Sequence, residues 1–575
     1  MSSRLAQAAI LLCALAGCSR SSRHPERMAV FPLENLSGDA SLDWASRASA
    51  EYLVESLAGS KTIYPVLVTS NDELWSTRAT RTLRGYFSVV NGRLTLKAQL
   101  EDAARSRKVS SYEASGPAPA GVLPLAGELV RRIDAGVTPS RMNNPEAWKA
   151  YVSALAQRPE EAASSLGKTL EIDPDFTPAT LLLARLRAAA GDRGAAGRIL
   201  DHALSRRAQL NEVQAAKLDL AASSLRGDPL TRFRAVSRLA MLIPADSDLT
   251  REAAEAATAA HDLRAAVSWY ERGTQLEPSN GILWNQLGYA RAYLKDLDGA
   301  VEAIRHYQRL APASANPDDS LGDVHFYLGR FSSAERHYLA AYGKDPKFLA
   351  GGTLFKAAQA RLMLRDTAAA NALFERYSAA RREAHDPAIE FTRAQWEYLI
   401  GNRQQALARV KQFAASWPRA VLQLVVWYLD VGQRETARAL VQTARPSASP
   451  QDAEMLAMAR FLSEPPASSS EWALRAEQAF PSAGETAMKK YALAYTLLFS
   501  KEYDAAALVL KQIVERTGPG SSDNAPVLYG WALAETGHAR EARAFLDVFP
   551  LPMPNGLSPF ACLSFPRQLD LRGRP

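Results

Sequence analysis

The residues of this chain that could perform catalysis do not stand at the spacings that known reaction centres require. Its eight histidines are scattered, and no pair shows the H-E-x-x-H pattern that places two zinc ligands on one helix face. No G-x-S-x-G turn is present to expose a nucleophilic serine. In the stretch AGSKT at 58–62, Ser60 stands where a phosphate-binding loop requires glycine before lysine. The sequence therefore predicts no enzyme activity, no cofactor and no metal site.

Cys18 is the residue whose surroundings predict a specific modification. It follows an apolar run at 5–15, which is about the length of a signal-peptide core and too short to span a bilayer. The small residues Ala16 and Gly17 before Cys18 resemble the bacterial lipobox, in which the thiol accepts a diacylglycerol and the cysteine becomes the mature N-terminus. We expect a lipoprotein signal peptide at 1–17, lipidation at Cys18 and a tether at 18–27. An ordinary secretory signal that contains a cysteine is the alternative.

Composition limits the other classes of partner. The chain has 575 residues, of which 47% are hydrophobic, and carries a net charge of +7. This is enough apolar material for several cores or for a long repeat array. The basic residues are dispersed along the sequence, whereas nucleic-acid binding usually requires a basic face. We therefore expect no nucleic acid as partner. The basic surplus is compatible with a position close to anionic lipid.

Residues 28–137 show the pattern of a small α+β domain. Apolar runs at 28–33 and 63–68 predict strands, and helical spacing predicts a helix between them. Asn91 and Gly92 join two alternating runs, and both residues tolerate the positive φ of a type I′ hairpin turn. A third strand is expected at 108–114 and a helix at 123–133.

Two segments of this domain resemble a known family. AVFPLENLSGDASLDW and LRGYFSVVNGRLTLKAQLEDAARSR resemble the opening and the later hairpin of the TolB N-terminal-like (FlgO-like) domain. Relatives with this domain are periplasmic, or regulatory proteins in which it precedes a repeat array. The resemblance implies no catalytic residues. The family's helix before the hairpin is shortened here, to about 71–81.

Residues 143–554 contain a repeat. Pro244, Pro278, Pro312 and Pro346 are each 34 residues apart, the length of a tetratricopeptide (TPR) helix hairpin. Within one period, Gly288 and Ala300 are small enough for two helices to approach closely, and Pro312 ends the second helix. The pattern resembles the TPR family and predicts a mainly α fold, a superhelical solenoid of about 11–12 hairpins preceded by the α+β domain. Residues 555–575 form a C-terminal tail.

The TPR resemblance implies a concave groove that is built from the first helix of each hairpin and that binds polypeptides. Aromatic rings beside carboxylates could hold an extended peptide with basic residues. The alternative for each ring is packing between helices. The candidate binding residues are Glu255, Asn285, Tyr289, Tyr293, Asp319, Asp323, Phe326, Tyr491, Tyr495 and Trp531.

These patterns predict a non-enzymatic scaffold. The chain is expected to be anchored through a lipid at Cys18, to face the periplasm in the bacterial cell envelope and to bind proteins or peptides in its groove. Two alternatives stay open. One is a regulatory or signalling protein with a TolB-like head, and the other is an envelope enzyme with an unrecognised site. A purely architectural spacer is a further reading of the array.

Overall fold

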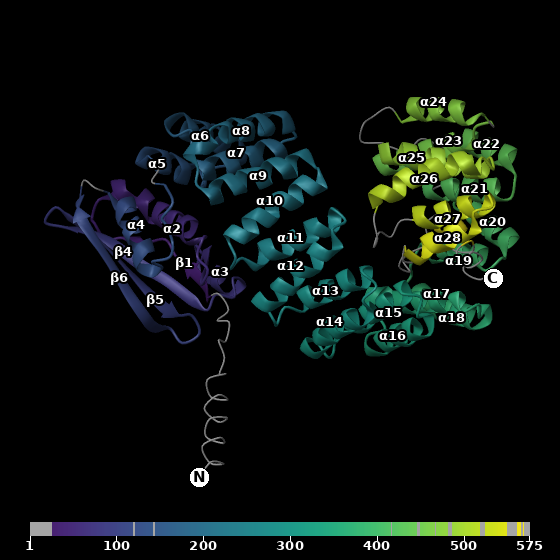
Figure 1. The fold of residues 1–575 in the computed structure, drawn as a ribbon, viewed down its shortest axis with the longest axis horizontal. Helices are drawn as coiled ribbons and strands as arrows, with labels where there is room; N and C mark the ends of the chain where they lie inside the picture. Colours follow the sequence, from purple (N-terminus) through teal and green to yellow (C-terminus); the bar gives the residue numbers. More distant parts are fainter. Residues whose placement is uncertain are drawn as a thin grey trace, which may run out of the picture. The chain divides into compact units, whose positions relative to one another are not determined.

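The computed structural model describes residues 26–118, 121–141, 144–415, 417–444, 449–465, 467–480, 486–517, 524–548, 560–564 and 567. The predicted signal peptide, Cys18 and most of the predicted tail lie outside these residues. The chain divides into two compact units after Leu283. Figure 1 draws the first unit in purple to teal and the second in teal to yellow.

The first unit begins with a mixed β-sheet. This sheet and the helices packed on it are called the head below. The strand order is β3-β1-β4-β5-β6, and β2 pairs with β4. β1 is parallel to β3 and β4, whereas β4, β5 and β6 are antiparallel. The strands are β1 (Glu26–Val30), β2 (Glu34–Asn35), β3 (Ile63–Leu67), β4 (Arg81–Val90), β5 (Arg93–Asp102) and β6 (Arg107–Pro117). At the β4–β5 turn, Asn91 and Gly92 have φ values of 50° and 70°, which confirms the predicted hairpin.

Two helices complete the head core, and a third is short. Leu53 of α2 (Asp43–Leu57), Leu129 of α4 (Val122–Ile133) and Leu96 of the sheet are fully buried in one cluster. The third helix, α3 (Asn71–Ser76), ends before the expected boundary near 81, so that boundary is wrong. Backbone pairing explains the early end, because the Thr80 N–H already donates to the Arg27 carbonyl at 2.8 Å.

Helix hairpins follow the head. Those of the first unit are formed by α5 (Pro145–Ala154), α6 (Pro159–Ile172), α7 (Thr177–Ala189), α8 (Arg193–Ser205), α9 (Glu212–Arg226), α10 (Pro229–Leu242), α11 (Ser247–Ala259) and α12 (Leu263–Leu276). The head contacts this array directly. Arg27 lies 3.2 Å from the Glu277 carboxylate, and Gln214 donates to Glu55 at 3.0 Å.

The second unit continues the array from within α13. Its helices are α13 (Gly281–Tyr293), α14 (Leu297–Leu310), α15 (Asn316–Tyr327), α16 (Phe331–Lys344), α17 (Gly352–Met363), α18 (Thr367–Glu383), α19 (Ile389–Leu399), α20 (Arg403–Lys411), α21 (Pro418–Asp430), α22 (Arg434–Thr443), α23 (Pro450–Ser463), α24 (Ser469–Ala479), α25 (Thr486–Phe499), α26 (Tyr503–Thr517), α27 (Ala525–Glu535) and α28 (Ala539–Val548). Within the described residues, α5 to α28 give twelve consecutive helix pairs, which confirms the predicted repeat fold.

The 34-residue period has a local structural cause in the four repeats that carry the periodic prolines. The four periodic prolines each stand two residues beyond a helix end, after α10, α12, α14 and α16. Proline cannot continue a helix, so the chain turns there. Inside the hairpins, Gly322 is required by close approach, since a Cβ there would meet the Tyr338 ring at 2.4 Å. The predicted roles of proline and small residues are therefore confirmed.

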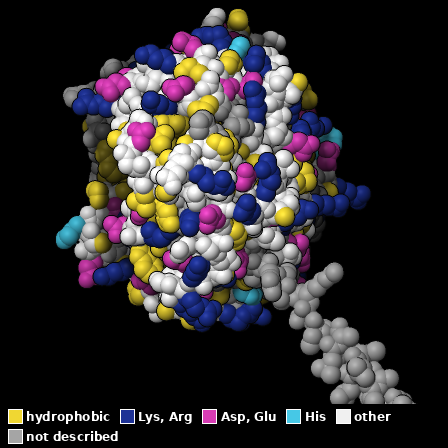
Figure 2. Space-filling model, turned by 90° about the vertical axis from the view of Figure 1, so that its left-hand side faces the viewer, with side chains coloured by type: hydrophobic (Ala, Val, Ile, Leu, Met, Phe, Trp, Pro, Cys, Tyr) yellow, Lys and Arg dark blue, Asp and Glu magenta, His cyan; other side chains and the backbone are white. Residues whose placement is uncertain are grey.

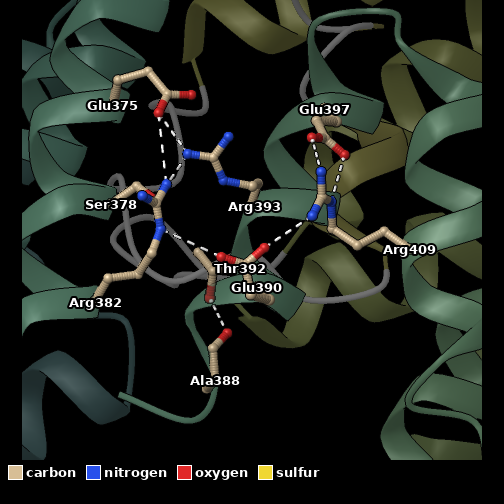
Figure 3. A network of polar contacts seen from close by, with 9 residues as sticks. All are labelled: Glu375, Ser378, Arg382, Ala388, Glu390, Thr392, Arg393, Glu397 and Arg409. Atoms are coloured by element: carbon tan, nitrogen blue, oxygen red, sulfur yellow. Dashed lines mark hydrogen bonds and ion pairs between the residues drawn. The ribbon is translucent and has the colours of Figure 1, made fainter. Parts of the chain in front are cut away.

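Charged side chains join α18, α19 and α20 in the second unit. Figure 3 shows Arg393 and Arg382 beside Glu375, and Arg382 and Arg409 beside Glu390. Arg409 also contacts Glu397 at 2.9 Å. Several of these side chains are more than a third exposed, so solvent screens their ion pairs. Each of these pairs therefore contributes little to the stability of the fold.

Candidate functional site

A groove with a volume of about 730 Å³ lies in the first unit. It is bounded by α2 of the head and by α5, α7, α8 and α9 of the array. Its apolar lining includes Tyr151, Leu155, Leu181, Leu182, Leu200 and Leu225. Leu155, Leu181, Leu182 and Leu225 keep part of their surface exposed, so the groove offers apolar area that the fold itself does not bury.

Trp148 fixes one wall of this groove. Its helix, α5, begins at Pro145, and the Asn144 side chain caps it by accepting from the Glu146 N–H at 2.9 Å. The Trp148 ring packs edge-on against Phe176 at 4.8 Å between centroids and against Tyr52 of the head at 6.3 Å. The head and the first hairpins therefore share one aromatic core, which holds the groove wall in place.

Two polar groups in the groove lining lack partners. The Trp148 indole N–H and the Thr177 hydroxyl are buried, and neither forms a hydrogen bond with any residue that the structure describes. A buried polar group without a partner costs about 1–3 kcal/mol of folding free energy. The groove lining therefore contains polar groups that the fold leaves unsatisfied.

The groove has charges of both signs at its border. Glu51 and Glu55 come from α2, whereas the cations Arg185, Arg193 and Lys217 come from α7, α8 and α9. Burial raises the pKa of Glu51, and the nearby Arg47, 3.4 Å away, offsets this only in part. Burial, followed by the Glu51 and Glu55 carboxylates, raises the pKa of Tyr151. The head side of the groove is therefore acidic and partly desolvated.

The structure brings Tyr289, Asp319 and Asp323 together in the second unit. Lys356 of α17 donates to Asp319 at 2.8 Å and to Asp323 at 3.0 Å. The Tyr338 hydroxyl donates to Asp323 at 2.8 Å, and Tyr289 donates to the same carboxylate at 3.0 Å. These five residues are called the Lys356 cluster below. Asp319, Asp323, Tyr338 and Lys356 are all buried.

Burial dominates the electrostatics of the Lys356 cluster. It raises the pKa of Asp319 to about 6, with the neighbouring Asp323 carboxylate adding to the effect and Lys356 opposing it. Burial lowers the pKa of Lys356, but the two carboxylates outweigh burial and leave it raised. A shifted carboxyl pKa can indicate a reaction centre. Here the carboxylates are buried and already hydrogen-bonded within the fold, which favours a structural role.

The other predicted residues near this cluster lie in two settings. Tyr293 is half-buried, and its ring lies 5.2 Å from that of Tyr327. Asn285 is also half-buried, and its side-chain oxygen has no hydrogen-bond partner. Phe326 is buried against Phe331.

The remaining predicted residues lie farther along the chain in sequence. Glu255, in the first unit, is exposed and pairs with Arg251 at 2.6 Å. In the second unit, Tyr495 is buried, close to Tyr491 at 6.4 Å between ring centroids. Trp531 donates from its indole to Glu535 at 3.2 Å. Partner binding by any of these residues stays a prediction.

Sequence reasoning missed both Lys356 and the groove of the first unit. Asp319 and Asp323 are four residues apart, so they share one face of a helix. Lys356 is the charged residue in the apolar stretch LFKAAQA, and a lone charge in such a stretch needs a buried partner. This pairing could have been inferred. The groove has no comparable signal, because α2 and α7 are far apart in sequence.

One face of the described surface is mixed in charge. On the face that Figure 2 shows, Lys and Arg side chains are interspersed with Asp and Glu. In the part of the chain that the structure describes, no group of three His, Cys, Asp or Glu could hold a metal ion. No helix among those residues is both long and apolar enough to cross a membrane.

Comparisons with known proteins identify the repeat type over part of the chain. Residues 153–220, from the end of α5 into α9, match the tetratricopeptide repeat family. A search of curated proteins finds no significant match. Among solved structures, the chain is similar to YrrB, described as a TPR protein with an unusual peptide-binding site. The identity is 16%, the match covers 32% of this chain and 95% of that chain, and the TM-score is 0.28.

Two further solved structures have similar values. For the MamA protein, identity is 18%, coverage is 30% of this chain and 94% of that chain, and the TM-score is 0.27. For the C-terminal part of a TPR repeat-containing protein from Cytophaga hutchinsonii, identity is 13%, coverage is 41% and 94%, and the TM-score is 0.33.

Proposed function

We propose that this chain is a non-enzymatic scaffold of the bacterial cell envelope, anchored by a lipid at Cys18, that binds polypeptides. The observation that carries the binding role is the groove of the first unit, with its partly exposed leucines. Helical-repeat arrays present extended surfaces of this kind, on which polypeptides dock. The resemblance of residues 28–137 to the TolB N-terminal-like domain supports an envelope location.

The lining of the groove indicates the chemistry of the bound segment. Leu181, Leu182 and Leu225 would bury apolar side chains of a ligand, at about 25 cal/mol per Å² of apolar area. Burial raises the pKa of Glu51 more than its ion pair with Arg47 lowers it, so a lysine or arginine of the ligand would further stabilise its ionised form. We therefore propose an amphipathic segment whose apolar side chains enter the groove and whose basic residue faces Glu51 and Glu55.

Peptide binding to the full chain tests this proposal. The probes are two synthetic peptides with the same apolar residues, one flanked by lysines and one by glutamates, measured by fluorescence polarisation. We expect the lysine peptide to bind more tightly, because α2 supplies two carboxylates. Leu181→Glu should weaken its binding by at least about tenfold, since the change buries an unpaired charge.

Leu230→Glu is the matched control. Leu230 is 45% exposed on α10 and does not line the groove, so the same substitution there should leave binding unchanged. Equal binding by wild type and Leu181→Glu would exclude the groove as the docking site. A preference for the glutamate peptide would show that the proposed orientation of charge is wrong.

The lipid anchor is tested separately by metabolic labelling with a fatty-acid analogue. The full chain expressed in bacteria should incorporate the label and sediment with membranes, whereas Cys18→Ala should do neither. Labelling that persists in Cys18→Ala would place the lipid elsewhere, and no labelling of the wild type would favour the ordinary secretory signal. Neither outcome depends on the groove.

A further inference from the structure

A cavity of about 540 Å³ in the second unit is lined by α14, α15 and α16. Its charged lining is mainly cationic. Arg305 and Arg309 come from α14, Arg336 and His337 from α16, and His325 from α15. Asp298 and Glu302, both on α14, are its acidic members.

The arginines of this cavity keep unused hydrogen-bonding capacity. Among the described residues, Arg305 and Arg309 form no ion pair, and Arg336 donates to the Ser333 hydroxyl at 3.0 Å. The acidic groups are not all available to them. Glu302 lies 4.0 Å from Arg291, and Asp318 of α15 is bound by Lys344 at 2.6 Å.

Two histidines lie side by side in the cavity lining. Their rings are parallel, with centroids 5.2 Å apart and planes inclined by 7°. Burial, followed by His337, Arg336, Arg305 and Arg330, lowers the pKa of His325 to about 4. Burial also lowers the pKa of His337, and Asp318 offsets this only in part. The Nδ1 atom of His325 is buried and has no partner.

We propose that this cavity binds a phosphomonoester, through Arg305, Arg309 and Arg336 with His325 and His337 completing the site. Guanidinium groups bind phosphate oxygens in bidentate, charge-assisted geometry. A phosphomonoester brings close to two negative charges and three acceptor oxygens at pH 7, which matches three guanidinium groups better than a single carboxylate does. The phosphoryl group could belong to a soluble metabolite or to a lipid headgroup, and the site chemistry is the same for both.

The first probe is glycerol 3-phosphate, titrated into the full chain by calorimetry and by NMR of isotope-labelled histidines. Binding should raise the pKa of His325 and of His337, because a bound dianion stabilises both imidazolium forms. Arg305→Gln combined with Arg336→Gln should weaken binding by at least about tenfold. Arg238→Gln is the control, since Arg238 is exposed on α10 and lies outside the cavity.

Binding of the chain to vesicles of phosphatidylcholine, with and without phosphatidic acid, distinguishes a lipid headgroup from a soluble metabolite as the source of the phosphoryl group. If the chain binds both glycerol 3-phosphate and phosphatidic acid, and the double variant binds neither, the result supports a phosphomonoester site that can also reach a lipid headgroup. Binding to glycerol 3-phosphate alone supports a soluble ligand, and binding to phosphatidic acid alone, if lost in the double variant, supports a lipid. The proposal is overturned if neither probe binds, or if the double variant binds like wild type.

Discussion

The groove of the first unit and the Lys356 cluster of the second unit both place tyrosine near carboxylates. In the groove Tyr151 lies near Glu51 and Glu55, and in the cluster Tyr289 and Tyr338 donate to Asp323. In the Lys356 cluster, Asp323 accepts from Lys356, Tyr338 and Tyr289, so the fold has used its hydrogen-bonding capacity. In the groove, Glu51 has Arg47 as a partner at 3.4 Å, and Trp148 and Thr177 have unpaired polar atoms. Residue type alone therefore does not identify a binding surface. What differs is whether the fold has already given each polar group a partner, and in the groove it has also left part of the leucine surface exposed.

The largest expected effect comes from removing the cation of the Lys356 cluster. Lys356→Met leaves Asp319 and Asp323 buried without a compensating charge, and such a change destabilises a protein by about 3–5 kcal/mol. In chemical denaturation of the full chain, monitored by circular dichroism, this variant should unfold at a lower denaturant concentration than wild type.

A triple variant separates charge from packing. Lys356→Met with Asp319→Asn and Asp323→Asn removes the uncompensated carboxylates, so it should regain most of the lost stability. If Lys356→Met unfolds at the same denaturant concentration as wild type, the cluster does not carry the structural role assigned to it. The phosphomonoester and peptide assays do not depend on this result.

The pH dependence of stability tests the same cluster without removing its lysine. The pKa of Asp319 is raised to about 6 in the folded state, above its ordinary value of 3.8. The folded chain therefore holds a proton that the unfolded chain has lost, and the stability contributed by this proton is present below pH 4 and is lost as pH rises to 6. From the two pKa values, this loss is at most about 3 kcal/mol.

Asp319→Asn isolates this contribution, because the other carboxylates titrate in both proteins. The difference in unfolding free energy between the two proteins should shift in favour of Asp319→Asn between pH 4 and pH 7. A difference that is constant over this range would mean that Asp319 titrates normally. A shift of opposite sign would mean that Lys356 depresses the pKa more strongly than burial raises it.

The sequence was sufficient for features with local causes. Proline at 34-residue spacing ends a helix wherever it occurs, and Asn91–Gly92 forms its turn from the backbone preferences of two residues. The end of α3 depended instead on pairing between Thr80 and Arg27, which are far apart in sequence. The groove likewise requires α2 to pack beside α5, and no periodicity within either helix reports that contact. Tyr289 and Asp323 were found from helical spacing, but the partner that buries them was not.

The smallest expected effect comes from a buried hydroxyl in the groove that has no partner among the described residues. Thr177→Val replaces a buried hydroxyl that has no partner with a methyl group of similar size, so stability should stay the same or rise by up to about 1 kcal/mol. Tyr338→Phe is the matched change in the Lys356 cluster. It removes a hydrogen bond to the Asp323 carboxylate and should cost about 1.5–3 kcal/mol. Thermal and chemical unfolding of both variants measure the contrast. Equal losses would mean that the Thr177 hydroxyl is satisfied after all, for instance by ordered water. Opposite signs would show that the buried Thr177 hydroxyl lacks a partner whereas the Tyr338 hydroxyl has one, as the two regions of the structure indicate.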